Sequence, residues 1–93
     1  MNTNERITTI KHRLEQKFSP TILEVIDDSE KHKGHAGSAE GAGHYTVIIA
    51  SAFFAAQSRV SIHREIYHVL ADLIPHEIHA LQIKIAKNMI QIK

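Results

Sequence analysis

The stretch His44-Tyr45-Thr46-Val47-Ile48-Ile49-Ala50 decides the fold of this chain. Its four consecutive residues from Thr46 to Ile49 are all β-branched, and the stretch contains no Asp, Glu, Lys or Arg. A short apolar run with little polar alternation is typical of a strand that is covered on at least one face. We therefore expect residues 44–50 to form the central strand of a small sheet.

Two other segments have the composition of flanking strands. Residues 21–27 are rich in β-branched side chains and are followed by the polar pair Asp28-Ser29. Residues 80–86 alternate cleanly, which predicts a strand with Leu81, Ile83 and Ile85 pointing inward. The first two strands can form an antiparallel hairpin, whereas the intervening helix permits a right-handed parallel crossover between the second and third.

Amphipathic helices are predicted before and after the hairpin. The spacing of Ile7, Ile10, Leu14 and Phe18 predicts a helix over residues 4–18, with Asn2 or Thr3 as its N-cap. Residues 52–56 are long enough for a single turn. A second helix is expected to start at the N-cap Ser58 and to reach about residue 74 before Pro75. Its apolar face is expected to comprise Val60, His63, Arg64, Tyr67, Leu70, Ala71 and Ile74.

The element order α-β-β-α-α-β predicts an α+β fold, a three-stranded mixed sheet with the helices packed on one face. A length of 93 residues and a hydrophobic fraction of 43% suit a single globular domain over 1–93. No stretch approaches the ~20 apolar residues of a membrane span, and no apolar signal core begins the chain. With no cysteine to form disulfides, we expect a cytoplasmic protein with no membrane partner.

The histidines and glycines are unevenly placed. Residues 29–43 contain all four glycines and no large apolar side chain, so we expect a flexible His/Gly-rich loop. His32 and His35 lie in this loop, and His76 and His79 lie at the entrance to the last strand. Neutral imidazole is the commonest protein metal ligand. Because the chain has no cysteine, any metal site uses imidazoles or carboxylates or is completed by another molecule.

The remaining histidines have structural explanations that compete with ligation. We expect His12 and His68 to be solvated on helix surfaces, and His76 to be exposed after Pro75. His63 is expected to be buried and hydrogen-bonded on the apolar face of the second helix. His44 is expected to pack at the start of its strand.

Several short segments together resemble the BolA family in their order and spacing. They are Asp27-Asp28-Ser29-Glu30-Lys31-His32, Gly34-His35-Ala36-Gly37, His44-Tyr45, Ile49-Ala50-Ser51-x-Phe53, Val60-x-x-His63-Arg64-x-x-Tyr67 and His79-Ala80-Leu81. The resemblance implies a class II KH-like fold and a partnership with monothiol glutaredoxins in iron–sulfur cluster trafficking or iron regulation. The chain departs from the family pattern at Asp28, which is commonly Glu, at Ile62, which is usually basic, and within residues 54–57, which lack the usual glycine.

The resemblance also implies a [2Fe-2S] cluster that is present only in the complex and is shared with the glutaredoxin and glutathione. His79 matches one ligand position, and His32 or His35 supplies the second, with His32 preferred. Such clusters are generally held by cysteine thiolates, although two histidines bind one iron in Rieske centres. A ligating imidazole normally donates its other ring nitrogen to an acceptor, for which Asp27, Asp28 and Glu77 are candidates.

Two other functions compete with the cluster adaptor. The first is a KH-like DNA- or RNA-binding transcriptional regulator, with Arg59, Arg64, Lys84 and Lys87 contacting phosphates. Against it, the net charge is only +1 and residues 55–58 lack a Gly-x-x-Gly motif. The second is a metal-buffering module built from His32, His35 and His44. No phosphate loop or nucleophile signature is present, so we expect no enzyme. The free protein is expected to be a monomer or a weak homodimer.

Overall fold

The computed structural model describes residues 1–29 and 42–86. Three of the residues singled out from the sequence, His32, His35 and Lys87, lie outside the described residues, as does most of the expected loop over 29–43. The two described segments contain both long helices and the whole sheet.

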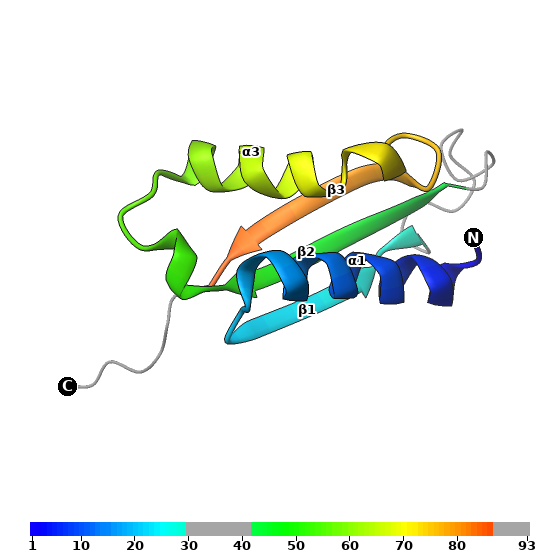
Figure 1. The fold of residues 1–93 in the computed structure, drawn as a ribbon. Coiled ribbons are helices and arrows are strands. Elements are labelled where there is room, and N and C mark those ends of the chain that lie inside the picture. Colours follow the sequence, from blue (N-terminus) through cyan, green and yellow to red (C-terminus); the bar gives the residue numbers. More distant parts are fainter. Residues whose placement is uncertain (30–41, 87–93) are drawn as a thin grey trace.

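The sheet has the order and directions that the sequence predicts. Strand β2 (Gly43–Ala50) is central, β1 (Ile22–Asp27) pairs with it antiparallel, and β3 (Ile78–Ile85) pairs with it parallel. Figure 1 shows the hairpin of β1 and β2 and the crossover through α3 that returns the chain to β3. The three-stranded mixed sheet of an α+β fold is therefore confirmed, while the KH-like classification stays a prediction.

The helices begin at the N-caps expected from the sequence. Helix α1 (Thr3–Phe18) starts at Asn2, whose side chain accepts a hydrogen bond of 2.8 Å from the Glu5 amide, while the Glu5 carboxylate accepts one of 2.9 Å from the Asn2 amide. This reciprocal capping box satisfies two amides that the helix itself leaves open. Helix α3 (Arg59–Val69) starts at Ser58, whose hydroxyl accepts from the Ser61 amide at 3.0 Å.

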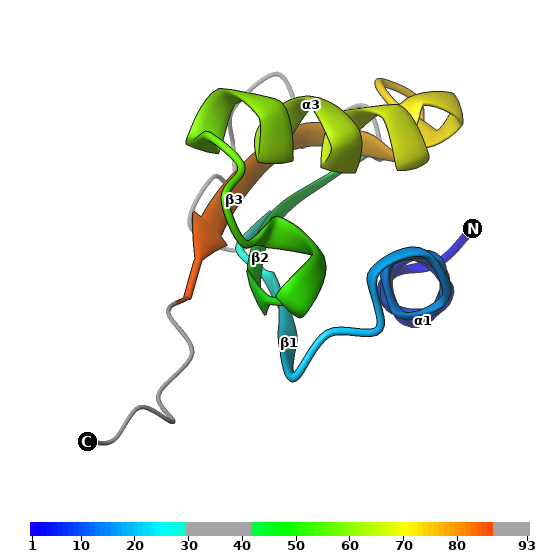
Figure 2. The ribbon, with the colours of Figure 1, turned by 60° about the vertical axis from the view of Figure 1, so that its left-hand side comes forward.

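The core lies between the helices and one face of the sheet, as Figure 2 shows from the side. Along β2, alternate side chains point into it. Its buried members from the sheet and the two helices include Tyr45, Val47, Ile49, Ile78, Ile10, Leu14, Phe18, Ile62 and Ile66. The other face of the sheet carries no helix among the described residues.

The predicted apolar face of the second helix is confirmed at Leu70, which is buried, and is wrong along the preceding turns. Val60 and Tyr67 are 61% and 40% exposed, and His63 is half-buried rather than buried. The core instead takes Ile62 and Ile66. Two stripes on this helix have spacings of three and four residues, and the structure buries the purely aliphatic one because it contains no polar group to desolvate.

The second helix also ends earlier than expected. It stops at Val69 and is followed by a short 3₁₀ turn, η3 (Ala71–Leu73), in place of helix to residue 74. This turn brings Leu73 into the core. Next to it, Arg13 of α1 forms an ion pair with Asp72, which lowers the pKa of that carboxyl. The single turn expected over 52–56 is the 3₁₀ turn η2 (Ala52–Phe54).

Ala56 has φ of 66°, in the left-handed region, where the resemblance to known sequences leads one to expect a glycine nearby. That conformation costs a residue with a Cβ about 1–2 kcal/mol, and glycine loses roughly 0.5–1 kcal/mol in backbone entropy. We expect Ala56→Gly to raise the free energy of unfolding by roughly 0.5–1 kcal/mol in urea denaturation. The control is Ala55→Gly, at φ of −60°, which should lower it. Equal losses in both variants would contradict the assignment of strain to Ala56.

Candidate metal-binding site

Strand β1 finishes and strands β2 and β3 begin at the same end of the sheet (Figure 1). Two histidines meet there. The ring centroids of His44 and His79 are 5.1 Å apart, and the ring planes are tilted by 52°. His44 is buried, with 8% of its surface exposed, whereas His79 is exposed. They line a hollow of about 340 Å³ together with Asp28, Tyr45, Ala80, Leu81 and Gln82.

His79 faces outward because β3 contains a bulge. Gly43 pairs with Ile78, but the next residue of β2, His44, pairs with Ala80, so His79 is an extra residue in the ladder. Ile78 is buried, and Leu81, three positions later, packs against the core. In a regular strand the next core-facing side chain would come two positions after Ile78. Bulges often redirect a side chain next to a functional site. Here the bulge leaves His79 and Ala80 exposed together.

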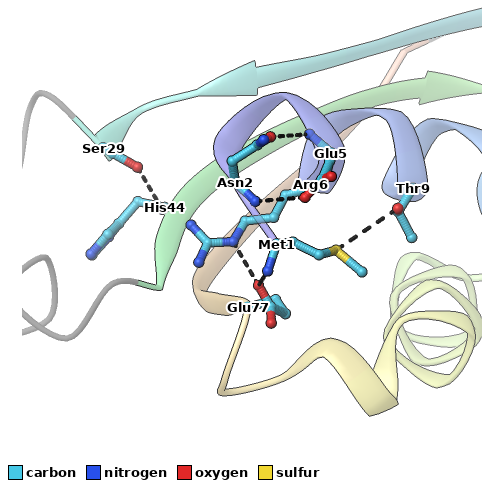
Figure 3. A network of polar contacts seen from close by, with 8 residues as sticks. All are labelled: Met1, Asn2, Glu5, Arg6, Thr9, Ser29, His44 and Glu77. Carbon is cyan, nitrogen blue, oxygen red and sulfur yellow. Dashed lines mark hydrogen bonds and ion pairs between the residues drawn. The ribbon is translucent and has the colours of Figure 1, made fainter.

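His44 is held from the end of β1. Its carbonyl accepts from the Asp28 amide at 2.7 Å, and its amide donates to the Ser29 hydroxyl at 3.1 Å (Figure 3). The Ser29 amide in turn donates to the Asp27 carboxylate at 2.8 Å, and the Thr46 hydroxyl donates to Asp28. The acidic residues that end β1 therefore also fix the backbone that carries His44.

Gly43 is required by a close approach of Tyr45. A Cβ added at Gly43 would lie 2.4 Å from the Tyr45 hydroxyl oxygen and 2.5 Å from two ring carbons, so no side chain fits there. Tyr45 is buried, and that burial raises the pKa of its hydroxyl, an effect that the nearby Arg6 opposes. This close contact between Gly43 and the Tyr45 ring fixes the backbone at the start of β2, which includes His44.

Glu77 lies just before β3 and contacts the N-terminus, α1 and β2 (Figure 3). Its carboxylate accepts from Arg6 Nε of α1 at 2.8 Å and lies 3.5 Å from the ammonium group of Met1. This hydrogen bond from Arg6 lowers the pKa of the Glu77 carboxyl. The Glu77 carbonyl accepts from the Gly43 amide at 3.1 Å. The turn that precedes His79 is thus tied to both α1 and β2.

Of the three predicted cluster ligands, His79 alone lies among the described residues, and it is exposed at the site. His44, expected either to pack at a strand end or to join a loop-based metal site, lies beside it. Within the two described segments, no three His, Cys, Asp or Glu side chains are arranged to hold a metal ion. His76 is exposed, as expected, and lines an adjoining hollow of about 350 Å³ with His79. Of the three candidate acceptors, Asp28 alone lines the hollow with the histidines.

The predicted phosphate-contacting residues separate onto two surfaces. Arg59 and Arg64 line a hollow of about 500 Å³ beside α3, with His63 and Tyr67. The Tyr67 hydroxyl donates to the Leu81 carbonyl at 2.9 Å and so fastens α3 to β3. Lys84 is exposed and follows the buried Ile83 of β3, so it points to the sheet face without helices.

Comparison with known proteins gives consistent results. A family model described as BolA-like protein matches residues 14–88. An uncharacterized protein in the cobS 5' region of Sinorhizobium sp. is 40% identical over 78 residues, which cover 82% of this chain and 84% of that protein. The DNA-binding transcriptional regulator BolA of Escherichia coli is 37% identical over 76 residues, covering 77% and 70%.

A solved structure matches the fold over a similar length. The BolA domain of SufE1 from Arabidopsis thaliana superposes with a TM-score of 0.76 at 38% identity, covering 86% of this chain and 88% of that one. Within residues 1–29 and 42–86, no helix combines the length and apolar character needed to cross a bilayer.

We expect Gly43→Ala to lower the free energy of unfolding by about 1–3 kcal/mol in urea denaturation, because its methyl group would overlap the Tyr45 ring. Tyr45→Leu, which removes the hydroxyl and the distal ring atoms, is the matched background. In the Tyr45→Leu background, the methyl group added at position 43 should lower the free energy of unfolding clearly less. A cost that is the same in both backgrounds would show that the Tyr45 ring does not impose glycine at this position.

Proposed function

The chain belongs to the BolA family, and from that premise we propose that it is a non-catalytic adaptor for a monothiol glutaredoxin. In this proposal the glutaredoxin and glutathione hold a [2Fe-2S] cluster, and His79 of this chain ligates one iron of it. The complex would serve iron–sulfur cluster trafficking or iron regulation in the cytoplasm.

The observation that carries the proposal is the placement of His79. The bulge makes it an exposed imidazole on the edge strand β3, at the end of the sheet and beside an open hollow. A second protein can therefore approach it without displacing the core. The turn that precedes it is held by the contacts of Glu77 with Arg6 and Gly43, so the imidazole is presented from a fixed backbone.

The donor set of this chain fits a shared cluster better than one of its own. An iron–sulfur cluster is generally held by cysteine thiolates, and the chain has no cysteine. It offers imidazoles, which take the place of two thiolates on one iron in Rieske centres and raise the reduction potential. The thiolates must then come from the partner and from glutathione. His32 or His35 remains the proposed second ligand from the loop.

His79→Ala tests the ligand assignment. Wild-type protein mixed anaerobically with cluster-loaded glutaredoxin and glutathione should give a visible circular dichroism spectrum different from that of the glutaredoxin alone. His79→Ala should lose or change the new bands, because one iron ligand is missing. Since His79 is exposed, the thermal unfolding of the variant should stay near that of the wild type.

His68→Ala is the matched control, because His68 is an exposed histidine of α3 that lines a different hollow. Its spectrum should equal that of the wild type. A wild-type spectrum in the His79→Ala complex would refute the ligand role of His79. If the wild-type protein leaves the spectrum of the cluster-loaded glutaredoxin unchanged, the adaptor function itself is refuted.

The arginine hollow beside α3 supports a second candidate function, binding to DNA. Arg59 and Arg64 lie beside the aromatic Tyr67, and the relative from Escherichia coli is named a DNA-binding transcriptional regulator. The loop before α3 has Ala55 and Ser58 where the Gly-x-x-Gly motif of a working KH domain has the glycines that clamp the nucleic-acid backbone. Lys84 points to a different face, so the basic surface is small.

Under this second function, binding to duplex DNA should weaken with salt, and the combined variant Arg59→Ala/Arg64→Ala should reduce the slope of log affinity against log salt by about one for each lost phosphate contact. Fluorescence anisotropy with labelled duplex measures both effects. Lys84→Ala is the control and should leave the slope unchanged. An unaltered slope in the double variant would exclude this surface as the DNA-binding site.

A further inference from the structure

We propose that His44 and His79 form a bis-imidazole site that binds a divalent transition-metal ion, with Zn²⁺ as the probe, in the free protein. The site shares His79 with the proposed cluster adaptor but needs neither glutaredoxin nor glutathione. It also differs from a loop-based metal buffer, because it pairs His44 with His79 of β3 and uses neither His32 nor His35.

The separation of the two rings suits a common metal ion. Two imidazoles that bind one tetrahedral metal through bonds of about 2.0–2.1 Å have ring centres about 5 Å apart. The observed separation of the centroids is 5.1 Å. The ring planes are tilted by 52°, which excludes a face-to-face stack in which the nitrogens could not converge on one ion. The separation of the two rings is therefore that of two imidazoles on a common ion.

The surroundings supply space for an ion. The hollow of about 340 Å³ beside the pair has room for an ion and for water molecules that complete its coordination. The Asp28 carboxylate lines the same hollow and accepts a hydrogen bond from Thr46, which anchors it there. The described residues provide no third ligand that closes the coordination shell. An open shell of this kind is typical of an exchangeable metal site and not of a structural one.

The two ligands combine a fixed imidazole with an accessible one. The backbone amide and carbonyl of His44 are both hydrogen-bonded to the end of β1, and its side chain is buried. His79 is exposed, so an ion can reach it from solvent. A pair of imidazoles suits Zn²⁺, Ni²⁺ and Cu²⁺ among the first-row metals. A bound ion would occupy His79 and so compete with a cluster carried by a partner.

Isothermal titration of the chelator-treated protein with ZnCl₂ tests the site. We expect one ion per chain for the wild type and for the double variant His32→Ala/His35→Ala. His79→Ala should bind at least about tenfold more weakly, because half of the imidazole pair is lost. His63→Ala and His68→Ala are controls on α3 and should bind as the wild type does.

A second measurement covers His44, because replacing a buried residue can disturb folding. Long-range ¹H–¹⁵N spectra of the wild-type imidazoles should show both His44 and His79 changing at the same Zn²⁺ concentration. Wild-type affinity in His79→Ala, loss of binding in His32→Ala/His35→Ala, or Zn²⁺-induced changes that omit His44 would each overturn the proposal. Glutaredoxin is absent throughout, so a negative result here leaves the cluster adaptor standing, and the reverse also holds.

Discussion

The bulge in β3 is the constraint on which the site depends. Regular alternation from Ile78 would place Leu81, Ile83 and Ile85 on the open face of the sheet. The core holds Ile78 together with all three of these side chains. Only an extra residue between Ile78 and Leu81 reconciles the two requirements, and the burial of the third strand thereby forces His79 outward. The exposed imidazole is a consequence of how the core is filled.

The contacts around the bulge keep that imidazole in one place. The Glu77 carboxylate accepts a hydrogen bond from Arg6 of α1, and the Glu77 carbonyl accepts one from the Gly43 amide of β2. Gly43 in turn lies under the ring of Tyr45, where no other residue type fits. Helix, central strand and edge strand therefore meet at the residues that flank His44 and His79. A fixed backbone favours binding of a partner or a metal ion, because less conformational entropy is lost when the complex forms.

Much of the fold follows from the sequence, since the β-branched run through Val47, the caps at Asn2 and Ser58 and the periodicity of α1 each have a local physical cause. The burial pattern of α3 does not, because two stripes satisfy the same spacing and only packing against the sheet selects Ile62 and Ile66. His79 was identifiable from the family resemblance. His44 was identifiable only as a partner of the loop histidines, because strand pairing and the bulge, both tertiary features, bring its ring beside that of His79.

The proposed metal site requires that His44 and His79 lie side by side at this end of the sheet in the free protein. A ¹³C-edited NOESY spectrum of the metal-free protein measures this directly through the imidazole ring protons. Rings in this arrangement should give cross-peaks of the order of those between the Phe18 and Phe54 rings, whose centroids are also 5.1 Å apart. Clear Phe18–Phe54 cross-peaks without any between His44 and His79 would contradict it.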